Sequence, residues 1–297
     1  MHSLVIHPSK KFLYAANTFS NDISLFTIAS TGALTEVTPR TQVTPYGTSP
    51  TLMVMDSTGS YLYVGNIASN NISVFNVDAS SGALTQISGS PFSIGTSPLN
   101  MALLPGGNFL YVTGGTSTPG FVEVFSISSG TLAFVQVLSA GTSPYGLAIA
   151  VNSGGSYLYA ANFGDNSISE YSIDTSTGIL TELPSSPMGQ SSVYSGPEAL
   201  LVDISNKYLY TANNGTTNLS GYAIGSDGGL TLLTNSPFVT NASPDVIGID
   251  PSGKYLFVGN QKSPAIQAFA LDTGSGDLTL VGSYPVPNTP TSIAVTQ

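Results

Sequence analysis

Residues 61–87 read YLYVGNIASNNISVFNVDASSGALTQI, and this stretch holds most of one structural repeat. Its aromatic-Leu-aromatic start returns along the chain at steps of 49, 48, 48, 51 and 47 residues, with copies beginning at Phe12, Tyr61, Phe109, Tyr157, Tyr208 and Tyr255. A proline marks each unit too, at Pro50, Pro98, Pro144, Pro197, Pro244 and Pro290. Self-similarity at a fixed period of this length is typical of repeat architectures.

One repeat, read from Pro50, predicts four short strands separated by turns of Asp, Ser, Asn and Gly. The expected strands are Leu52–Met55, Tyr61–Gly65, Ile72–Val77 and Ala83–Ile87. They are rich in β-branched and aromatic residues, and no stretch shows a helical period. Six such units predict an all-β fold, a β-propeller of four-stranded antiparallel blades that stack face to face. An open β-solenoid is the alternative, although its repeats are usually shorter.

The repeat predicts a single domain over residues 1–297. The expected blades cover 1–48, 49–96, 97–142, 143–195, 196–242 and 243–288, and 289–297 repeats the first strand of a blade as an extra inner strand. Two hypotheses account for that strand: a natural precursor with further strands upstream, or a six-bladed ring with a spare strand. We expect a monomer, with a risk of association because an unpaired strand exposes its backbone groups.

Composition narrows the classes of function. The chain has 16 acidic and 6 basic residues, a net charge of −10 and no cysteine, so we expect no nucleic-acid partner and no thiolate metal site. Charged residues make up 7%, against roughly 25% in an ordinary globular protein. No apolar run is long enough to span a bilayer. The uncharged polar composition favours an extracellular, periplasmic or cell-surface protein whose leader is absent from this sequence.

The repeat resembles the YVTN-type repeat of the lactonase-like (6-phosphogluconolactonase-like) β-propeller family, which is usually seven-bladed. The resemblance rests on 61–66, 71–75 and 81–85, which return as 157–162, 166–171 and 177–181. It implies a propeller fold and either a lactone hydrolase acting on phosphogluconolactone or a cyclase that makes muconolactones. In that family the catalytic segments carry clustered His, Glu and Arg, whereas this chain has Arg40 as its one arginine and His2 and His7 as its histidines.

Two classes of function therefore remain. The first is a non-enzymatic propeller that binds a protein or glycan through its loops and channel mouth, and the missing His and Arg residues favour it. The alternative is a lactone hydrolase with its site at the central channel. An enzyme should gather titratable groups in a pocket. A scaffold should instead expose aromatic residues in loops, for which the candidates are Phe19, Tyr46, Phe163 and Tyr194.

The residue after each marker proline should open an innermost strand near one mouth of the channel. On consecutive blades these residues are Glu198 and Asp245, and they are the candidate catalytic pair. Nearby carboxylates push their pKa values apart, which suits acid and base catalysis. The same pair could instead bind Ca²⁺ through its oxygens, or remain two hydrated carboxylates. No other cofactor and no other metal site is predicted.

Three further residues are candidate ligand contacts at this mouth: Tyr145 as a stacking face, Asn100 as an amide, and His2 at the frayed terminus. His7 precedes Pro8 in a turn, and we expect it to cap that turn. The asparagines that follow the second strand, Asn17, Asn66, Asn162, Asn213 and Asn260, should cap exposed backbone groups or occupy left-handed turn positions.

Overall fold

The computed structural model describes residues 3–45, 47–115, 119–152, 154–189, 195–240 and 242–295. These residues form six antiparallel sheets and contain no helix. In the described ranges, therefore, no helix is available to cross a bilayer. The chain divides into two compact units, which are Met1–Gly114 with Glu123–Gln136 and Thr296–Gln297, and Gly115–Val122 with Val137–Val295. The expectation of one domain stays a prediction.

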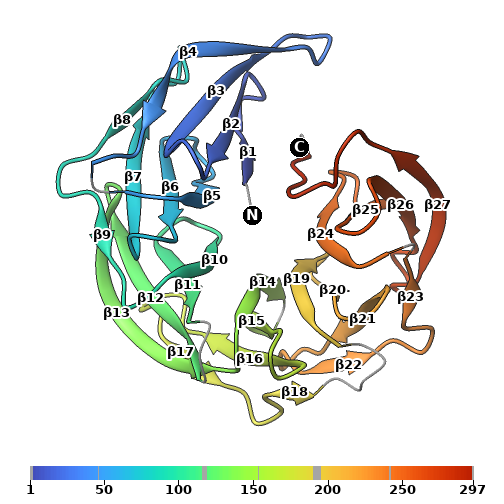
Figure 1. Cartoon of the computed structure of the whole chain (residues 1–297). Helices are drawn as coiled ribbons and strands as arrows, with labels where there is room; N and C mark the ends of the chain where they lie inside the picture. The colour runs from blue at the N-terminus through green and yellow to red at the C-terminus, as the bar shows by residue number, and fades with distance from the viewer. Residues whose placement is uncertain are drawn as a thin grey trace. The chain divides into compact units, whose positions relative to one another are not determined.

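The first unit holds two complete sheets and most of a third (Figure 1). Sheet one consists of β1 (Leu4–Ile6), β2 (Phe12–Asn17), β3 (Asp22–Ile28) and β4 (Leu34–Gln42). Sheet two consists of β5 (Pro50–Met55), β6 (Tyr61–Asn66), β7 (Asn71–Val77) and β8 (Leu84–Gln86), with β9 (Phe92–Ser93) also on β7. Sheet three consists of β10 (Pro98–Leu103), β11 (Phe109–Gly114), β12 (Gly120–Ser128) and β13 (Thr131–Ala140).

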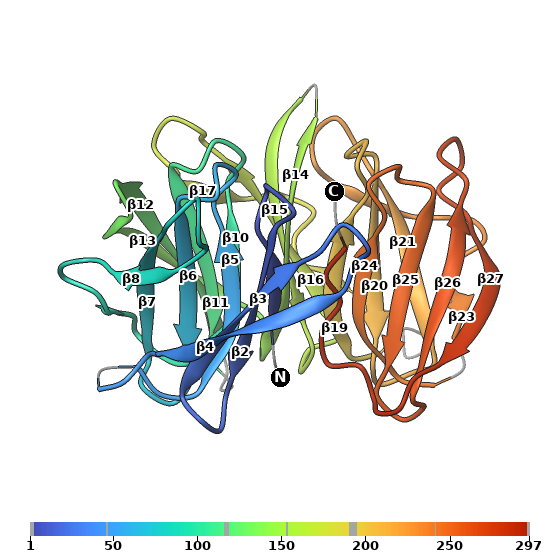
Figure 2. The ribbon, with the colours of Figure 1, turned by 90° about the horizontal axis from the view of Figure 1, so that it is seen from above.

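The second unit holds sheets four to six. Sheet four consists of β14 (Pro144–Asn152), β15 (Gly155–Asn162), β16 (Ser167–Ile173) and β17 (Leu180–Glu182), with β18 (Met188–Gly189) on β16. Sheet five consists of β19 (Pro197–Val202), β20 (Tyr208–Asn213), β21 (Asn218–Ile224) and β22 (Leu230–Leu232), with β23 (Phe238–Val239) on β21. Sheet six consists of β24 (Pro244–Ile249), β25 (Tyr255–Asn260), β26 (Ala265–Leu271) and β27 (Leu278–Pro285), which lie side by side in Figure 2.

Hydrophobic cores lie between successive sheets of each unit. In the second unit, Tyr159 of sheet four packs in one cluster with Leu209 of sheet five, and Tyr210 of sheet five packs in another with Leu256 of sheet six. Successive strand residues point to opposite faces, so each aromatic-Leu-aromatic triplet supplies both clusters at once. This explains why the triplet is the most regular part of the repeat.

The asparagines at the ends of the second strands bond other side chains instead of capping exposed backbone, which corrects the predicted role; Asn66, Asn162, Asn213 and Asn260 are fully buried and Asn17 is half-buried. Asn213 Nδ2 donates to Asn218 Oδ1 and to Ser220 Oγ, both at 2.8 Å. Similar side-chain bonds recur at Asn17, Asn66 and Asn162, and Asn260 bonds Gln267. Buried polar groups are stable only when hydrogen-bonded, so this asparagine fixes the second strand against the third.

Sheet three makes a similar buried polar contact with different residues. Gly114 stands where the other sheets have asparagine, and Glu123 stands where most have serine. Glu123 Oε1 accepts the Gly95 N–H at 2.8 Å, much as Asn162 Oδ1 accepts the Gly141 N–H at 3.1 Å. Burial raises the pKa of Glu123. One longer acidic side chain thus replaces the missing amide.

The predicted extra inner strand at 289–297 is wrong for residues 289–295, which form no strand. A strand needs a hydrogen-bonding partner, and the other copies of this pattern pair with the aromatic strand that follows them. The segment instead packs on sheet six, where Pro290 and Ile293 approach Gly259 and Gly248.

Candidate functional site

The residue after each marker proline sits in a β-bulge. In sheets two to six the pairing of the first strand with the second skips one residue directly after the proline; the skipped residues are Thr51, Leu99, Tyr145, Glu198 and Asp245. A bulge re-aims the side chain of the extra residue and is frequent beside active sites. The same β-bulge therefore recurs in these five sheets, and each sheet carries a different side chain at the bulged position.

Glu198 and Asp245, the predicted catalytic pair, occupy the bulges of two neighbouring first strands, β19 and β24. Asp245 is 6% exposed, and its Oδ1 is buried with no hydrogen-bond partner among the described residues. Glu198 is half-buried. The structure thus brings the two carboxyl groups together, while their catalytic role stays a prediction.

The two carboxyl groups interact directly. Burial, the charge of Asp245 and a side-chain hydrogen bond with Asp245, in that order, raise the pKa of Glu198 to about 8. A hydrogen bond between two carboxyl groups requires a proton on one of them, and like charges in one site cannot both ionise easily. Glu198 therefore holds its proton more firmly than an ordinary carboxyl group does.

Tyr145 occupies the bulge of β14, the strand that approaches β19 closely. Gly146 permits the approach, because a Cβ there would lie 3.1 Å from the Glu198 carbonyl oxygen and 2.9 Å from Ala161 Cβ. The Tyr145 ring packs edge-on against Phe163, with ring centroids 5.6 Å apart. The predicted stacking residue thus lies on the strand next to that of Glu198, and its contact with a ligand stays a prediction.

Phe163 also helps to fix the loop before Glu198, a role that the sequence did not predict. A Cβ on Gly196 would lie 3.0 Å from Phe163 Cε2, and Gly196 has a φ of +70° that favours glycine. The Gly196 N–H donates to Asn166 Oδ1 at 2.7 Å. Phe163 was expected to be one of the exposed loop aromatics, but it is half-buried, whereas Phe19 is exposed.

For the other predicted contacts, a role at this mouth stays a prediction. Asn100 lies in β10 of the first unit, where its Oδ1 accepts the Met101 N–H at 2.8 Å. His2, Tyr46 and Tyr194 lie outside the described residues. His7 Nδ1 accepts the Ser9 N–H at 3.0 Å and Nε2 donates to the Gly59 carbonyl at 3.1 Å, which agrees with a turn cap.

The one arginine of the chain is paired within the first unit. Arg40 belongs to the first unit and is engaged by Glu36 at 2.7 Å and Asp22 at 3.8 Å. No cluster of three or more metal-ligating side chains occurs in the described ranges. A calcium ion at Glu198 and Asp245 stays a prediction.

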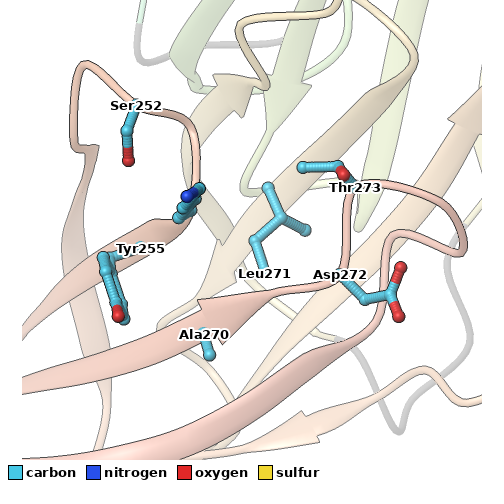
Figure 3. A pocket seen from close by; sticks show the side chains of 7 residues that line it. Ser252, Tyr255, Ala270, Leu271, Asp272 and Thr273 are labelled. Carbon is cyan, nitrogen blue, oxygen red and sulfur yellow. The ribbon is translucent and has the colours of Figure 1, made fainter.

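A hollow of about 570 Å³ lies on sheet six, but at the opposite ends of its strands from Asp245. It is lined by Ser252, Lys254, Tyr255, Ala270, Leu271, Asp272 and Thr273 (Figure 3). β24 begins beside Asp245 and ends just before this hollow, at Ile249. The hollow is therefore separate from the acidic pair.

Comparison with known proteins assigns the chain to a family over almost its whole length. The family model described as "Lactonase, 7-bladed beta-propeller" matches residues 3–97, 89–192 and 181–295. No curated protein matches. Together with the six four-stranded sheets, the family match confirms the predicted all-β propeller and the predicted lactonase-like resemblance.

Solved structures agree on the fold. A protein from Lactobacillus plantarum is 23% identical with a TM-score of 0.83, covering 98% of this chain and 86% of that one. A candidate 6-phosphogluconolactonase from Bacteroides fragilis is 20% identical with a TM-score of 0.80, covering 98% and 85%. The periplasmic gluconolactonase of Pseudomonas aeruginosa is 18% identical with a TM-score of 0.78, covering 97% and 86%.

Proposed function

The chain belongs to the family of seven-bladed lactonase β-propellers, and from this premise we propose that it hydrolyses a sugar lactone at Glu198 and Asp245. The observation that carries the proposal is the placement of Glu198 and Asp245 on the bulges of two neighbouring strands, where burial and the charge of Asp245 raise the pKa of Glu198 to about 8. The sequence alone favoured a non-enzymatic binding scaffold. The family match and the gluconolactonase among similar structures favour the hydrolase instead.

A Glu198 side chain that keeps its proton suits the chemistry of lactone opening. Asp245 accepts a proton from a water molecule as the water oxygen forms a bond to the lactone carbonyl carbon. Collapse of the tetrahedral intermediate breaks the bond between that carbon and the ring oxygen. Glu198 gives its proton to the departing ring oxygen, which becomes a hydroxyl group. The product is an open hydroxy acid, and transfer of a proton back to Glu198 restores the pair.

The surrounding charge favours a neutral sugar lactone over a phosphorylated one. A phosphate group is usually held by arginine forks or several cations. In the described part of the second unit, the strand ends near Asp245 offer Lys262, which is exposed in the turn after β25. Lys207 and Lys254 precede β20 and β25, at the opposite strand ends. We therefore expect gluconolactone to be a better substrate than 6-phosphogluconolactone.

We also propose that the protein works outside the cytoplasm. Its surface chemistry supports this, because Ser, Thr, Asn and Gly replace most charged residues and no cysteine is present. The P. aeruginosa gluconolactonase with the same fold is a periplasmic protein. Fractionation of the source cells, with the protein detected by antibody, tests the location; recovery in the cytoplasmic fraction alone would contradict it.

The function is tested by measuring acid release from gluconolactone, 6-phosphogluconolactone and simple γ- and δ-lactones, corrected for spontaneous hydrolysis. We expect Glu198→Gln and Asp245→Asn each to lower kcat by about 10²–10⁴-fold, the usual contribution of acid–base catalysis. Thr51→Val is the matched control, because Thr51 occupies the same bulge position in sheet two.

Two outcomes would contradict the proposal. Absence of turnover in folded wild-type protein would leave a lactonase fold without lactonase activity. Turnover that survives both substitutions would place the chemistry elsewhere in the molecule.

A further inference from the structure

A second row of side chains accompanies the bulge residues of the second unit. In sheets four, five and six, the second strand ends on a buried asparagine that pairs with the marker proline. The residues after these asparagines are Phe163, Asn214 and Gln261, and we call them the rim residues. Because neighbouring strands lie about 5 Å apart, each rim residue stands about one strand spacing from the bulge residue of its own sheet.

Backbone hydrogen bonds give the rim residues the same register in all three sheets. Each donates its N–H to the carbonyl of the residue just before the marker proline: Phe163 to Ser143 at 3.0 Å, Asn214 to Gly196 at 2.8 Å and Gln261 to Ser243 at 2.8 Å. The bulge residues Tyr145, Glu198 and Asp245 follow those prolines directly. The rim row therefore accompanies the bulge row from sheet four to sheet six.

Contacts between the sheets join the rim residues to one another. A Cβ on Gly196 of sheet five would lie 3.0 Å from Phe163 Cε2 of sheet four. Asn214 Nδ2 of sheet five donates to Gln261 Oε1 of sheet six at 3.5 Å. The Phe163 ring also meets the Tyr145 ring edge-on, with centroids 5.6 Å apart. One row thus leads from an aromatic ring to two amides, and it lies wholly within the second unit.

The chemistry of the rim suits a sugar ring. An aromatic ring offers an apolar face for the C–H groups of a pyranose, and an amide both donates to and accepts from hydroxyl groups. The bond between Asn214 and Gln261 uses one group of each amide, so Asn214 Oδ1 can still accept and Gln261 Nε2 can still donate. None of the rim residues carries a charge, which favours hydroxyl groups over phosphate or carboxylate.

The first unit has a different set of residues at the rim position. Sheets one, two and three carry Thr18, Ile67 and Gly115 there. The aromatic ring and the paired amides therefore occur in the same sheets as Tyr145, Glu198 and Asp245. A position that the stacking of the sheets left free to vary has thus acquired ligand-binding chemistry beside the carboxyl pair.

We propose that the rim residues bind a second sugar ring, so that the preferred substrate is a lactone at the end of an oligosaccharide. This inference rests on the proposed hydrolase, because it places the lactone ring at Glu198 and Asp245. The next ring lies one strand spacing away, a step about the breadth of one sugar. There it packs against Phe163 and exchanges hydrogen bonds with Asn214 and Gln261.

The kinetic test compares the δ-lactones of cellobionic and maltobionic acids with gluconolactone. We expect kcat/KM of the wild type to favour at least one disaccharide lactone by about tenfold, the gain from one or two added hydrogen bonds. Gln261→Ala and Phe163→Ala should lower that preference. Ile67→Ala is the matched control at the rim position of sheet two and should keep it. The preference is a ratio measured on one protein, so a loss of folded molecules does not change it.

A binding test separates this inference from the proposed function. Cellobiose, maltose and glucose are neutral sugars that are not lactones, so they report binding without turnover. In nuclear magnetic resonance titrations, we expect one disaccharide to shift the side-chain amide signals of Asn214 and Gln261 at a concentration about tenfold lower than glucose requires. Phe163→Ala should weaken this response, and Ile67→Ala should leave it unchanged.

The outcomes distinguish the two proposals. Hydrolysis of gluconolactone without a preference for either disaccharide lactone would overturn the inference and leave the proposed function standing. A preference that both Gln261→Ala and Phe163→Ala retain would overturn it as well, because the second ring would then bind elsewhere. If no lactone is hydrolysed, the proposed function fails and the titration decides: disaccharides that leave the Asn214 and Gln261 signals unmoved would overturn the inference.

Discussion

The two ends of the strands in the second unit differ in how strictly they follow the repeat. Where the first strands begin, the bulge residue changes from Tyr145 to Glu198 to Asp245. At the hairpin ends, a glycine and a tyrosine return with the same contacts from one sheet to the next. The same residues return at positions where neighbouring sheets contact each other. The residues differ at the bulge positions, which the stacking of the sheets does not require. We therefore place stability at the hairpin ends and function at the bulge ends.

The largest expected effect is at a hairpin end. Tyr210 is fully buried and donates to the Gly276 carbonyl, so Tyr210→Ala should lower the free energy of unfolding by about 3–5 kcal/mol. Tyr210→Phe keeps the ring and should cost about 1–3 kcal/mol, because the buried carbonyl loses its partner. Urea titration measures both. If activity per folded molecule fell along with stability, the separation of the two ends would fail.

The next effect compares two equivalent glycines. Gly276→Ala must hold an alanine at a φ of +79° and press its Cβ into Tyr208, so we expect a loss of about 2–4 kcal/mol. Gly32→Ala meets the same backbone penalty in open space and should cost about 1–2 kcal/mol. The difference between the two in dilute solution measures the hairpin contact. Equal losses would show that the backbone alone requires glycine there.

The sequence predicted much of the architecture, because a repeat reports its own period. The aromatic triplets marked the second strands, and the marker prolines located the first. The pattern of backbone hydrogen bonds between the strands could not be predicted in the same way. Strand pairing at 289–295 depends on a partner strand, and the bulge after each proline is a feature of backbone hydrogen bonds that no residue type encodes.

The candidate site was predicted in part for the same reason. Equivalent positions on consecutive repeats put Glu198 beside Asp245, and the structure brings them together. The roles of Phe163 and Gly146 could not be predicted, because each depends on contacts between sheets. Their signal in the sequence is weak: a phenylalanine after the asparagine of sheet four, and a glycine where other sheets have larger residues.

The smallest expected effect is a pH dependence at the bulge end. Glu198 must carry a proton to donate it, so kcat/KM should fall about tenfold per pH unit above a pKa of about 8. Stability should respond as well. Because the folded protein holds this proton more tightly than the unfolded chain, the free energy of unfolding should fall as pH rises from the ordinary value of 4.5 to about 8.

Glu198→Gln should remove that fall in stability, and the Thr51→Val control should keep it. Kinetics and urea titrations at matched pH values measure the two trends. If Glu198→Gln retained the wild-type pH dependence of both quantities, the titrating proton would reside on another group, and Glu198 would not be the catalytic acid. If the stability trend disappeared while the kinetic trend remained in Glu198→Gln, Glu198 would be a buried acid without a part in the reaction.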